Sequence, residues 1–127
     1  MTNYCELMKE WHQKFDVPMK TAPEFPTKNR AELRYNLIKE EVKEFKKALN
    51  DGNIIEVADA LGDLLYVTFG AGIEFGLPMD ALFEEIHRSN MTKLWPDGKP
   101  VKRADGKILK PKTYSPPNLK KVLFNKD

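Results

Sequence analysis

The sequence predicts an all-α fold, with a four-helix core followed by an irregular basic tail. Apolar residues recur at helical spacing over most of residues 3–95, and short clusters of turn residues separate the periodic segments. Beyond residue 95 the periodicity stops, and proline, glycine and lysine become frequent. We therefore predict one domain over residues 1–127, with a helical core at about 3–95 and a tail at 96–127.

The first predicted element is a helix over residues 3–15, where apolar residues such as Leu7, Trp11 and Phe15 share one face. Three prolines between residues 18 and 26 follow it. Because proline lacks the backbone N–H and restricts the residue before it, this segment is predicted to be an extended connection.

A second helix begins at about residue 29, and a third runs from about Ile54 to Phe75. Between them lie residues 50–53, N-D-G-N, which are typical of a tight turn, so the two helices are predicted to form an antiparallel hairpin. The third helix is apolar on nearly all sides, which predicts that most of its surface is buried. Three glycines within it indicate a tightly packed face, which we expect to lie between subunits.

Two pairs of carboxylates flank the predicted turn, Glu41 with Glu44 and Glu56 with Asp59. A spacing of three residues puts both members of a pair on one face of a helix. Because Glu44 and Asp59 are at similar distances from the turn, the hairpin would bring the two acidic faces together. Such a cluster repels itself unless a cation lies within it, and an all-oxygen set suits Mg²⁺ or Mn²⁺.

Acidic residues three apart are also typical of an ordinary solvated face, and the lysines around the first pair offer surface partners. The second pair favours a functional interpretation. It lies, with Asp63, on the helix that is expected to be buried, where an unpaired carboxylate is costly.

A fourth helix is predicted over residues 78–94, beginning at a proline and packing Leu82 and Ile86. In the tail, the dipeptide D-G occurs at residues 97–98 and again at 105–106. The second is flanked by P-V-K-R and K-I-L-K, which predicts a short β-hairpin.

The composition, 41% hydrophobic and 31% charged, is ordinary for a soluble globular protein. No apolar run reaches the roughly 20 residues of a membrane span, no signal-peptide core is evident, and one cysteine cannot form an internal disulfide, so we expect a cytoplasmic protein. Residues 1–95 hold 12 Lys+Arg and 16 Asp+Glu, whereas residues 96–127 hold 9 and 3. The basic tail fits either nucleic-acid binding or contact with an anionic substrate.

Several motifs together resemble a known family. E-E-x-x-E at residues 40–44, E-x-x-D at residues 56–59 and H-R-S-N-x-x-K at residues 87–93 occur in this order. With W-H-Q-K-F from residue 11 and D-G-K-I-L-K-P from residue 105, they resemble the all-α nucleoside triphosphate pyrophosphohydrolases. The similarity is to the MazG-like, phosphoribosyl-ATP pyrophosphohydrolase-like branch, which is related to the dimeric dUTPases.

The resemblance implies a MazG-like four-helix core that assembles as a homodimer or homotetramer and uses Mg²⁺ or Mn²⁺. The implied metal ligands are Glu41, Glu44, Glu56 and Asp59. Glu41 or Glu40 would act as general base on a bound water. The candidate substrate-binding residues are Asp63, Tyr66, Asn90, Lys93, Lys107, Lys110 and His12.

The reaction implied is cleavage of a (deoxy)nucleoside triphosphate such as dUTP to the monophosphate and pyrophosphate. One alternative keeps the chemistry but takes phosphoribosyl-ATP, in histidine synthesis. Another is a non-enzymatic helical module that binds nucleic acid or regulates a partner through its basic tail. Nucleic acid is the less favoured partner, and no membrane partner is expected.

Overall fold

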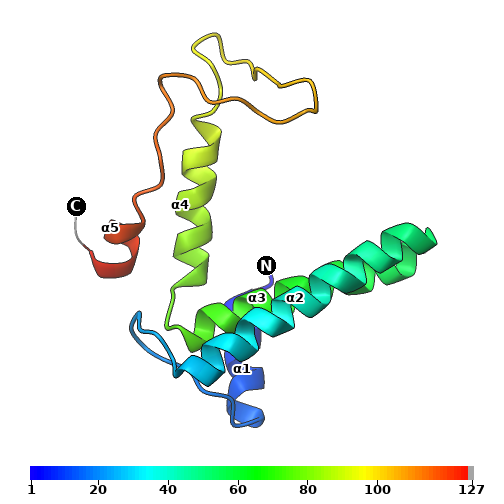
Figure 1. The fold of residues 1–127 in the computed structure, drawn as a ribbon. Coiled ribbons are helices and arrows are strands. Elements are labelled where there is room, and N and C mark those ends of the chain that lie inside the picture. Colours follow the sequence, from blue (N-terminus) through cyan, green and yellow to red (C-terminus); the bar gives the residue numbers. More distant parts are fainter. Residues whose placement is uncertain (126–127) are drawn as a thin grey trace. The chain divides into compact units, whose positions relative to one another are not determined.

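The computed structural model describes residues 1–125, and the elements are helical (Figure 1). The helices are α1 (Tyr4–Lys14), α2 (Lys28–Asp51), α3 (Ile54–Glu74), α4 (Met79–Met91) and α5 (Leu119–Phe124). The predicted all-α fold with four substantial helices is confirmed. Contacts divide the chain into an N-terminal unit, Met1–Met79, and a C-terminal unit, Asp80–Asp127, which we describe in turn.

Capping residues mark the ends of the first three helices. Asn3 caps α1 by accepting a hydrogen bond from the Glu6 N–H, and Thr27 caps α2 in the same way. At the other end of α2, Gly52 adopts the left-handed conformation with φ 62°, which a residue without Cβ tolerates. Asn53 then caps α3, so the chain reverses within two residues.

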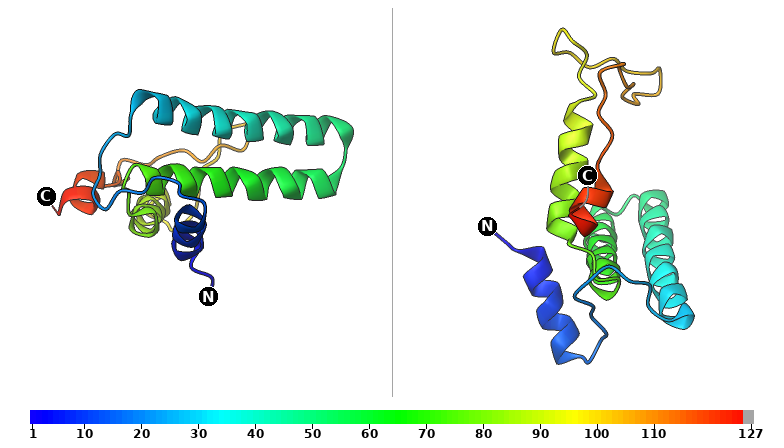
Figure 2. Two further views of the ribbon diagram at one scale, coloured as in Figure 1. Left: turned by 90° about the horizontal axis from the view of Figure 1, so that it is seen from below. Right: turned by 90° about the vertical axis from the view of Figure 1, so that its left-hand side faces the viewer.

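The reversal makes α2 and α3 an antiparallel helical hairpin, as the turn residues predicted (Figure 2). The two helices lie side by side along most of their length. Helix α1 packs on α3, where Met8 is 3% exposed and Ile73 is 6% exposed. Small residues, Ala48 on α2 and Ala60 on α3, allow the hairpin helices to approach closely and are each 3% exposed.

The prediction that α3 is buried on most sides is wrong for this chain by itself. Ile54 and Ile55 are 75% and 73% exposed, and Leu65 is 57% exposed. Three of its acidic residues, Glu56, Asp59 and Asp63, are exposed too. The apolar pattern was correct, but among the described residues the helices that pack on α3 are chiefly α1 and α2, which leave much of a helix that is apolar all round uncovered.

A buried polar cluster joins the beginning of α2 to the end of α3. Glu74 is fully buried and its carboxylate accepts three N–H groups, two from Arg30 and one from Arg34. The N···O distances are 2.6 to 2.8 Å, which is typical of charge-assisted bonds. No local sequence pattern points to this cluster, because its members are far apart in the chain.

The C-terminal unit consists of α4 and the segment that follows it. Within residues 96–113 the structure has one isolated antiparallel bridge, Lys102 with Ile108, rather than the predicted β-hairpin of two strands. Asp105 folds the turn by accepting hydrogen bonds from the Arg103 side chain and from the Lys107 N–H. The chain then returns alongside α4 and ends in the short helix α5 (Figure 1).

None of the helices in the described part of the chain is both long enough and apolar enough to cross a lipid bilayer.

Candidate functional site

The hairpin brings the predicted acidic residues of two helices onto neighbouring faces. Glu41 and Glu44 lie on α2, and Glu56, Asp59 and Asp63 lie on α3. Because Gly52 and Asn53 make a tight reversal, residues equally far from the turn on the two helices come level with one another. The three- and four-residue spacings keep each helix's acids on one face.

The pKa of Glu41 reports this proximity. Partial burial raises the pKa of its carboxyl, and the negative charges of Asp63, Glu44, Asp59 and Glu40 raise it further. Two of these four charges are on the opposite helix. The charges of α2 and α3 therefore act on the same carboxylate, and the cluster carries an excess of negative charge.

Lysine at position 47 gives a second indication of the same arrangement. A hydrogen bond to Asp51, at 2.9 Å, is the main cause that raises the pKa of the Lys47 ammonium. The charges of Glu44, on its own helix, and Glu56, on the opposite helix, add to it. The acidic surface thus extends from Asp63 toward the turn at Gly52.

The carboxylates are on the surface rather than in the interior. Glu41 is half-buried, and Glu44, Glu56, Asp59 and Asp63 are exposed. Among residues 1–125, no three His, Cys, Asp or Glu side chains stand in an arrangement that could hold a metal ion. The donor set is all oxygen and strongly negative, so its chemistry fits a hard divalent cation.

Tyr66 lies one helical turn beyond Asp63 and borders an apolar hollow between α1 and α3. Its ring makes an edge contact with Trp11, at 6.1 Å between ring centres. The hollow has a volume of about 220 Å³ and is lined by Tyr66, Gly62 and Leu65 of α3 and by Tyr4 and other α1 residues. It offers ring surface but few polar groups.

His12, a predicted substrate contact, is enclosed by protein. The residue is fully buried, and its Nδ1 lies 3.1 Å from the Pro18 carbonyl oxygen, to which it donates. Nε2 is buried without a hydrogen-bond partner. Burial lowers the pKa of the imidazole, so the neutral ring is favoured. The ring has no surface that a substrate could contact, and its place is in the core beside Arg34.

The motif H-R-S-N-x-x-K spans the last residues of α4 and the two residues after it, and its side chains fall into two groups. Arg88, Ser89 and Thr92 bind the returning tail through their side chains. Asn90 is exposed and Lys93 is half-buried. The sequence analysis singled out Asn90 and Lys93 but not the three residues that hold the tail.

The two tail lysines differ in their surroundings. Lys107 is exposed, and its main chain closes the turn with Arg103. Lys110 is exposed as well, but its ammonium lies 5.0 Å from the centre of the Tyr114 ring, within cation–π range.

Two comparisons with known proteins bear on these residues. The chain is 39% identical, over 83 residues, to the uncharacterized protein L479 of Acanthamoeba polyphaga mimivirus. The match covers 62% of this chain but only 33% of that protein, so the chain spans about a third of the length of this curated relative. The family model described as phosphoribosyl-ATP pyrophosphohydrolase matches residues 8–90, which include the candidate acidic residues of α2 and α3. The chain belongs to the phosphoribosyl-ATP pyrophosphohydrolase family, within the MazG-like all-helical superfamily.

Proposed function

We propose that the protein is a metal-dependent nucleoside triphosphate pyrophosphohydrolase, which cleaves a (deoxy)nucleoside triphosphate such as dUTP to the monophosphate and pyrophosphate. One observation carries the proposal. Carboxylates of α2 and α3 act electrostatically on the single carboxyl of Glu41, in a chain of a pyrophosphohydrolase family. An ordinary solvated face would pair such charges with lysines rather than gather them.

Glu41, Glu44, Glu56 and Asp59 would hold Mg²⁺ or Mn²⁺. When bound, such an ion neutralises the triphosphate and lowers the pKa of a water molecule toward neutrality. The acidic residues would also keep the site from binding a nucleotide without its cation, since a bare triphosphate would be repelled.

The reaction adds the oxygen of water to the α-phosphorus and breaks the bond from that phosphorus to the α–β bridging oxygen. Glu41 is the favoured general base, because burial and the neighbouring negative charges raise the pKa of its carboxyl, and Glu40 is the alternative. The carboxylate takes one proton from the attacking water, and the electron pair of the broken bond leaves with pyrophosphate.

Other residues are assigned to the substrate. Asp63 and Tyr66 would contact the sugar or base, Tyr66 by offering its ring beside the apolar hollow. Asn90 and Lys93 would contact the phosphates or sugar, and Lys107 and Lys110 would stabilise the charge on the leaving pyrophosphate. His12 is left out of this set because it is fully buried.

The protein is proposed to act as a homodimer or homotetramer. The exposed apolar residues Ile54, Ile55, Leu61 and Leu65 of α3 support this, because a stripe of such side chains is costly in water. A second copy of the chain would cover them. Sedimentation or light scattering at micromolar concentration gives the assembly state directly.

Phosphoribosyl-ATP is the second candidate substrate, and the name of the matching family favours it. A screen with Mg²⁺ and with Mn²⁺ decides between the two. Deoxynucleoside triphosphates, ribonucleoside triphosphates and phosphoribosyl-ATP are compared, and the monophosphate product and pyrophosphate are both quantified. If the chain is instead a non-enzymatic module that binds nucleic acid, no substrate should be cleaved, and the chain should bind DNA or RNA with a steep dependence on salt.

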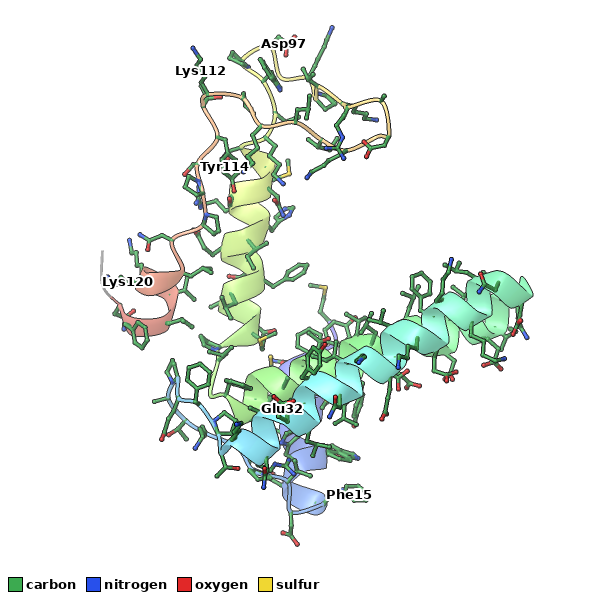
Figure 3. The ribbon with its side chains drawn as sticks, viewed as in Figure 1. Phe15, Glu32, Asp97, Lys112, Tyr114 and Lys120 are labelled. Atoms are coloured by element: carbon green, nitrogen blue, oxygen red, sulfur yellow. The ribbon has the colours of Figure 1, made fainter. Side chains whose placement is uncertain are left out.

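The variants Glu44→Gln and Asp59→Asn test whether the acidic residues carry the reaction. Each is expected to lower kcat by at least about 100-fold while the protein stays folded. Glu32→Gln is the matched control, because Glu32 is an exposed glutamate of α2 away from the acidic cluster (Figure 3). Full activity of Glu44→Gln, or activity in excess chelator, would exclude the mechanism.

A further inference from the structure

The tail of the C-terminal unit is attached to α4 by hydrogen bonds from side chains. Ser89 Oγ lies 2.8 Å from the Ser115 carbonyl oxygen and 3.1 Å from the Tyr114 hydroxyl. A carbonyl only accepts, so the one hydrogen of Ser89 goes to Ser115, and the Tyr114 hydroxyl donates to Ser89. Thr92 Oγ1 accepts the Ser115 N–H at 2.8 Å. Figure 3 shows Tyr114 beside the C-terminal half of α4.

A second set of bonds continues this attachment along the helix. Arg88 donates to the Ser115 hydroxyl and to the Pro116 carbonyl oxygen, both at 3.1 Å. Glu85 holds Arg88 with two bonds and also accepts the Asn118 N–H at 2.7 Å. The bonds from Arg88 and from the Asn118 N–H lower the pKa of Glu85 to about 2, so the carboxylate stays ionised at any physiological pH.

The attachment fixes the Tyr114 ring. Ser89 is 1% exposed, so its hydroxyl has no water to exchange for Tyr114, and the ring is held at its outer end. The ammonium of Lys110 lies over that ring at 5.0 Å. A free lysine side chain samples many rotamers, and fixing it costs conformational entropy. The contact with Tyr114 removes part of this cost before any ligand binds.

The loop that carries Lys110 is strongly basic. Between residues 96 and 113 there are five lysines and one arginine, against two aspartates, and Arg103 is already paired with Asp105. Trp95 closes the base of the loop: its main-chain N–H donates to the Lys99 carbonyl oxygen, and its indole N–H donates to the Leu109 carbonyl oxygen at 3.4 Å. Loops of this length with little regular structure are commonly functional. The excess of lysines fits a compact polyanion.

We propose that Ser89 and Tyr114 are positioning residues, which hold the Lys110 ammonium ready for the phosphate chain of the substrate. The inference rests on the proposed function and deepens it. Ser89 fixes Tyr114, Tyr114 fixes Lys110, and Lys110 contacts the phosphates that leave as pyrophosphate. The serine of H-R-S-N-x-x-K thus serves phosphate binding without touching the nucleotide.

Three variants test the successive contacts from Ser89 to Tyr114 to Lys110. Tyr114→Phe removes only the hydroxyl, Ser89→Ala removes its acceptor, and Lys110→Met removes the charge. We expect Lys110→Met to raise the dissociation constant for pyrophosphate and the KM for the triphosphate by about 10-fold, as for the loss of one charge-assisted bond. Ser89→Ala and Tyr114→Phe should raise both by about 3- to 10-fold. The double variant Ser89→Ala/Lys110→Met should bind no more weakly than Lys110→Met.

The matched control is the pair Tyr35 and Lys39 of α2. Lys39 Nζ lies 6.0 Å from the centre of the exposed Tyr35 ring, so the pair has the same chemistry without a fixed ring. Tyr35→Phe and Lys39→Met should leave pyrophosphate binding unchanged. The thermal unfolding of every variant is recorded, so that a loss of folding is not taken for a loss of binding.

Pyrophosphate binding, measured by calorimetry, needs no turnover and separates the two proposals. If Lys110→Met binds pyrophosphate as the wild type does, Lys110 does not contact phosphate and the inference is wrong, even where Glu44→Gln abolishes hydrolysis. If Lys110→Met weakens binding but Ser89→Ala and Tyr114→Phe do not, or if their effects add to it, the positioning role is wrong. If no triphosphate is cleaved but the three variants weaken pyrophosphate binding alike, the proposed function fails and the positioning stands.

Discussion

Arg34 Nε donates to Glu74 Oε1 across 2.6 Å and thereby joins α2 to the last residue of α3. Arg30 adds two further bonds to the same carboxylate. The two helices of the hairpin are therefore joined at one end by the turn at Gly52 and at the other by this ion cluster. The acidic residues Glu41 and Asp59 lie between the turn and the cluster, so their relative positions depend on both.

Replacing Glu74 with glutamine is expected to destabilise the protein by about 3–5 kcal/mol. Glu74 is fully buried, and its loss leaves the charge of Arg34, 6% exposed, without its acceptor. Urea unfolding measures the change. Asp51→Asn breaks the exposed pair with Lys47 and is the control, expected to cost less than about 1 kcal/mol. Equal effects of the two variants would show that the buried cluster does not hold the hairpin.

The free energy of unfolding should decrease in two steps as the pH is lowered. Burial lowers the pKa of His12 below 6.5, so the unfolded chain takes up a proton that the folded protein resists, and stability declines as the pH drops below 6.5. Burial alone raises the pKa of Glu74, but the bonds from Arg30 and Arg34 outweigh it and leave the pKa lowered. Its contribution is complete above pH 4.5 and is lost as the pH falls further.

The melting temperature between pH 5 and 7 separates the two groups. In His12→Asn the slope in this range should flatten, whatever the stability of the variant at pH 7. His87→Asn, on the exposed surface of α4, should keep the wild-type slope. A wild-type melting temperature that is constant from pH 7 to pH 5 would contradict the assignment to His12.

Without metal, Glu41→Gln should stabilise the protein although it abolishes turnover. The four neighbouring carboxylates disfavour the ionised form of Glu41, and the neutral amide removes this repulsion. We expect a gain of roughly 0.5 kcal/mol, or about 2–4 °C in melting temperature. The measurement is differential scanning calorimetry in the presence of a chelator. A lower melting temperature than that of the wild type would mean that Glu41 is favourably paired.

Addition of Mg²⁺ or Mn²⁺ should stabilise the wild type more than variants that lack a proposed metal ligand. A ligand at 100 times its dissociation constant stabilises the folded state by about 2.7 kcal/mol. The wild type should gain this amount, whereas Glu44→Gln and Asp59→Asn should gain little. Samples of each protein with a chelator and no added metal are the references. If the ion stabilises the wild type and the variants equally, it binds somewhere other than these carboxylates.

Two glycines of α3 should respond in opposite ways to alanine. A Cβ at Gly70 would come within 2.9 Å of Arg34 Nη1, so Gly70→Ala should displace the buried cluster and destabilise the protein. A Cβ at Gly62 meets nothing within 4 Å in the chain, so Gly62→Ala should gain up to about 1 kcal/mol of helix propensity. Loss of the assembly in Gly62→Ala, seen by light scattering, would instead mean that a second chain approaches this glycine.

The periodicity of the sequence was sufficient to predict helices α1 to α4 and the reversal between α2 and α3, but it did not predict the short helix α5. The turn residues Asn50 to Asn53 specify a local structure, and local structure depends on neighbours in the chain. The tail was less predictable, because its shape depends on hydrogen bonds to α4 that no local pattern encodes. The expected two-stranded hairpin is one bridge, between Lys102 and Ile108.

The candidate acidic residues could be identified from spacing, but their surroundings could not. Glu56 and Asp59 were expected on a buried helix and are exposed. His12 was expected at the substrate and is in the core, because its Nδ1 meets a carbonyl six residues ahead. Such contacts depend on how α1 packs on α3, which the side-chain pattern of α1 does not specify.

The sequence by itself determined the helical hairpin and the acidic residues that it places on neighbouring faces, since helix periodicity and turn chemistry act over a few residues. Only the tertiary structure decided that Arg34 meets Glu74 and that Ser89 meets Tyr114. These pairs are separated by 40 and 25 residues. Their formation depends on packing and on the high cost of leaving a buried polar group unpaired, and neither is written in the local pattern.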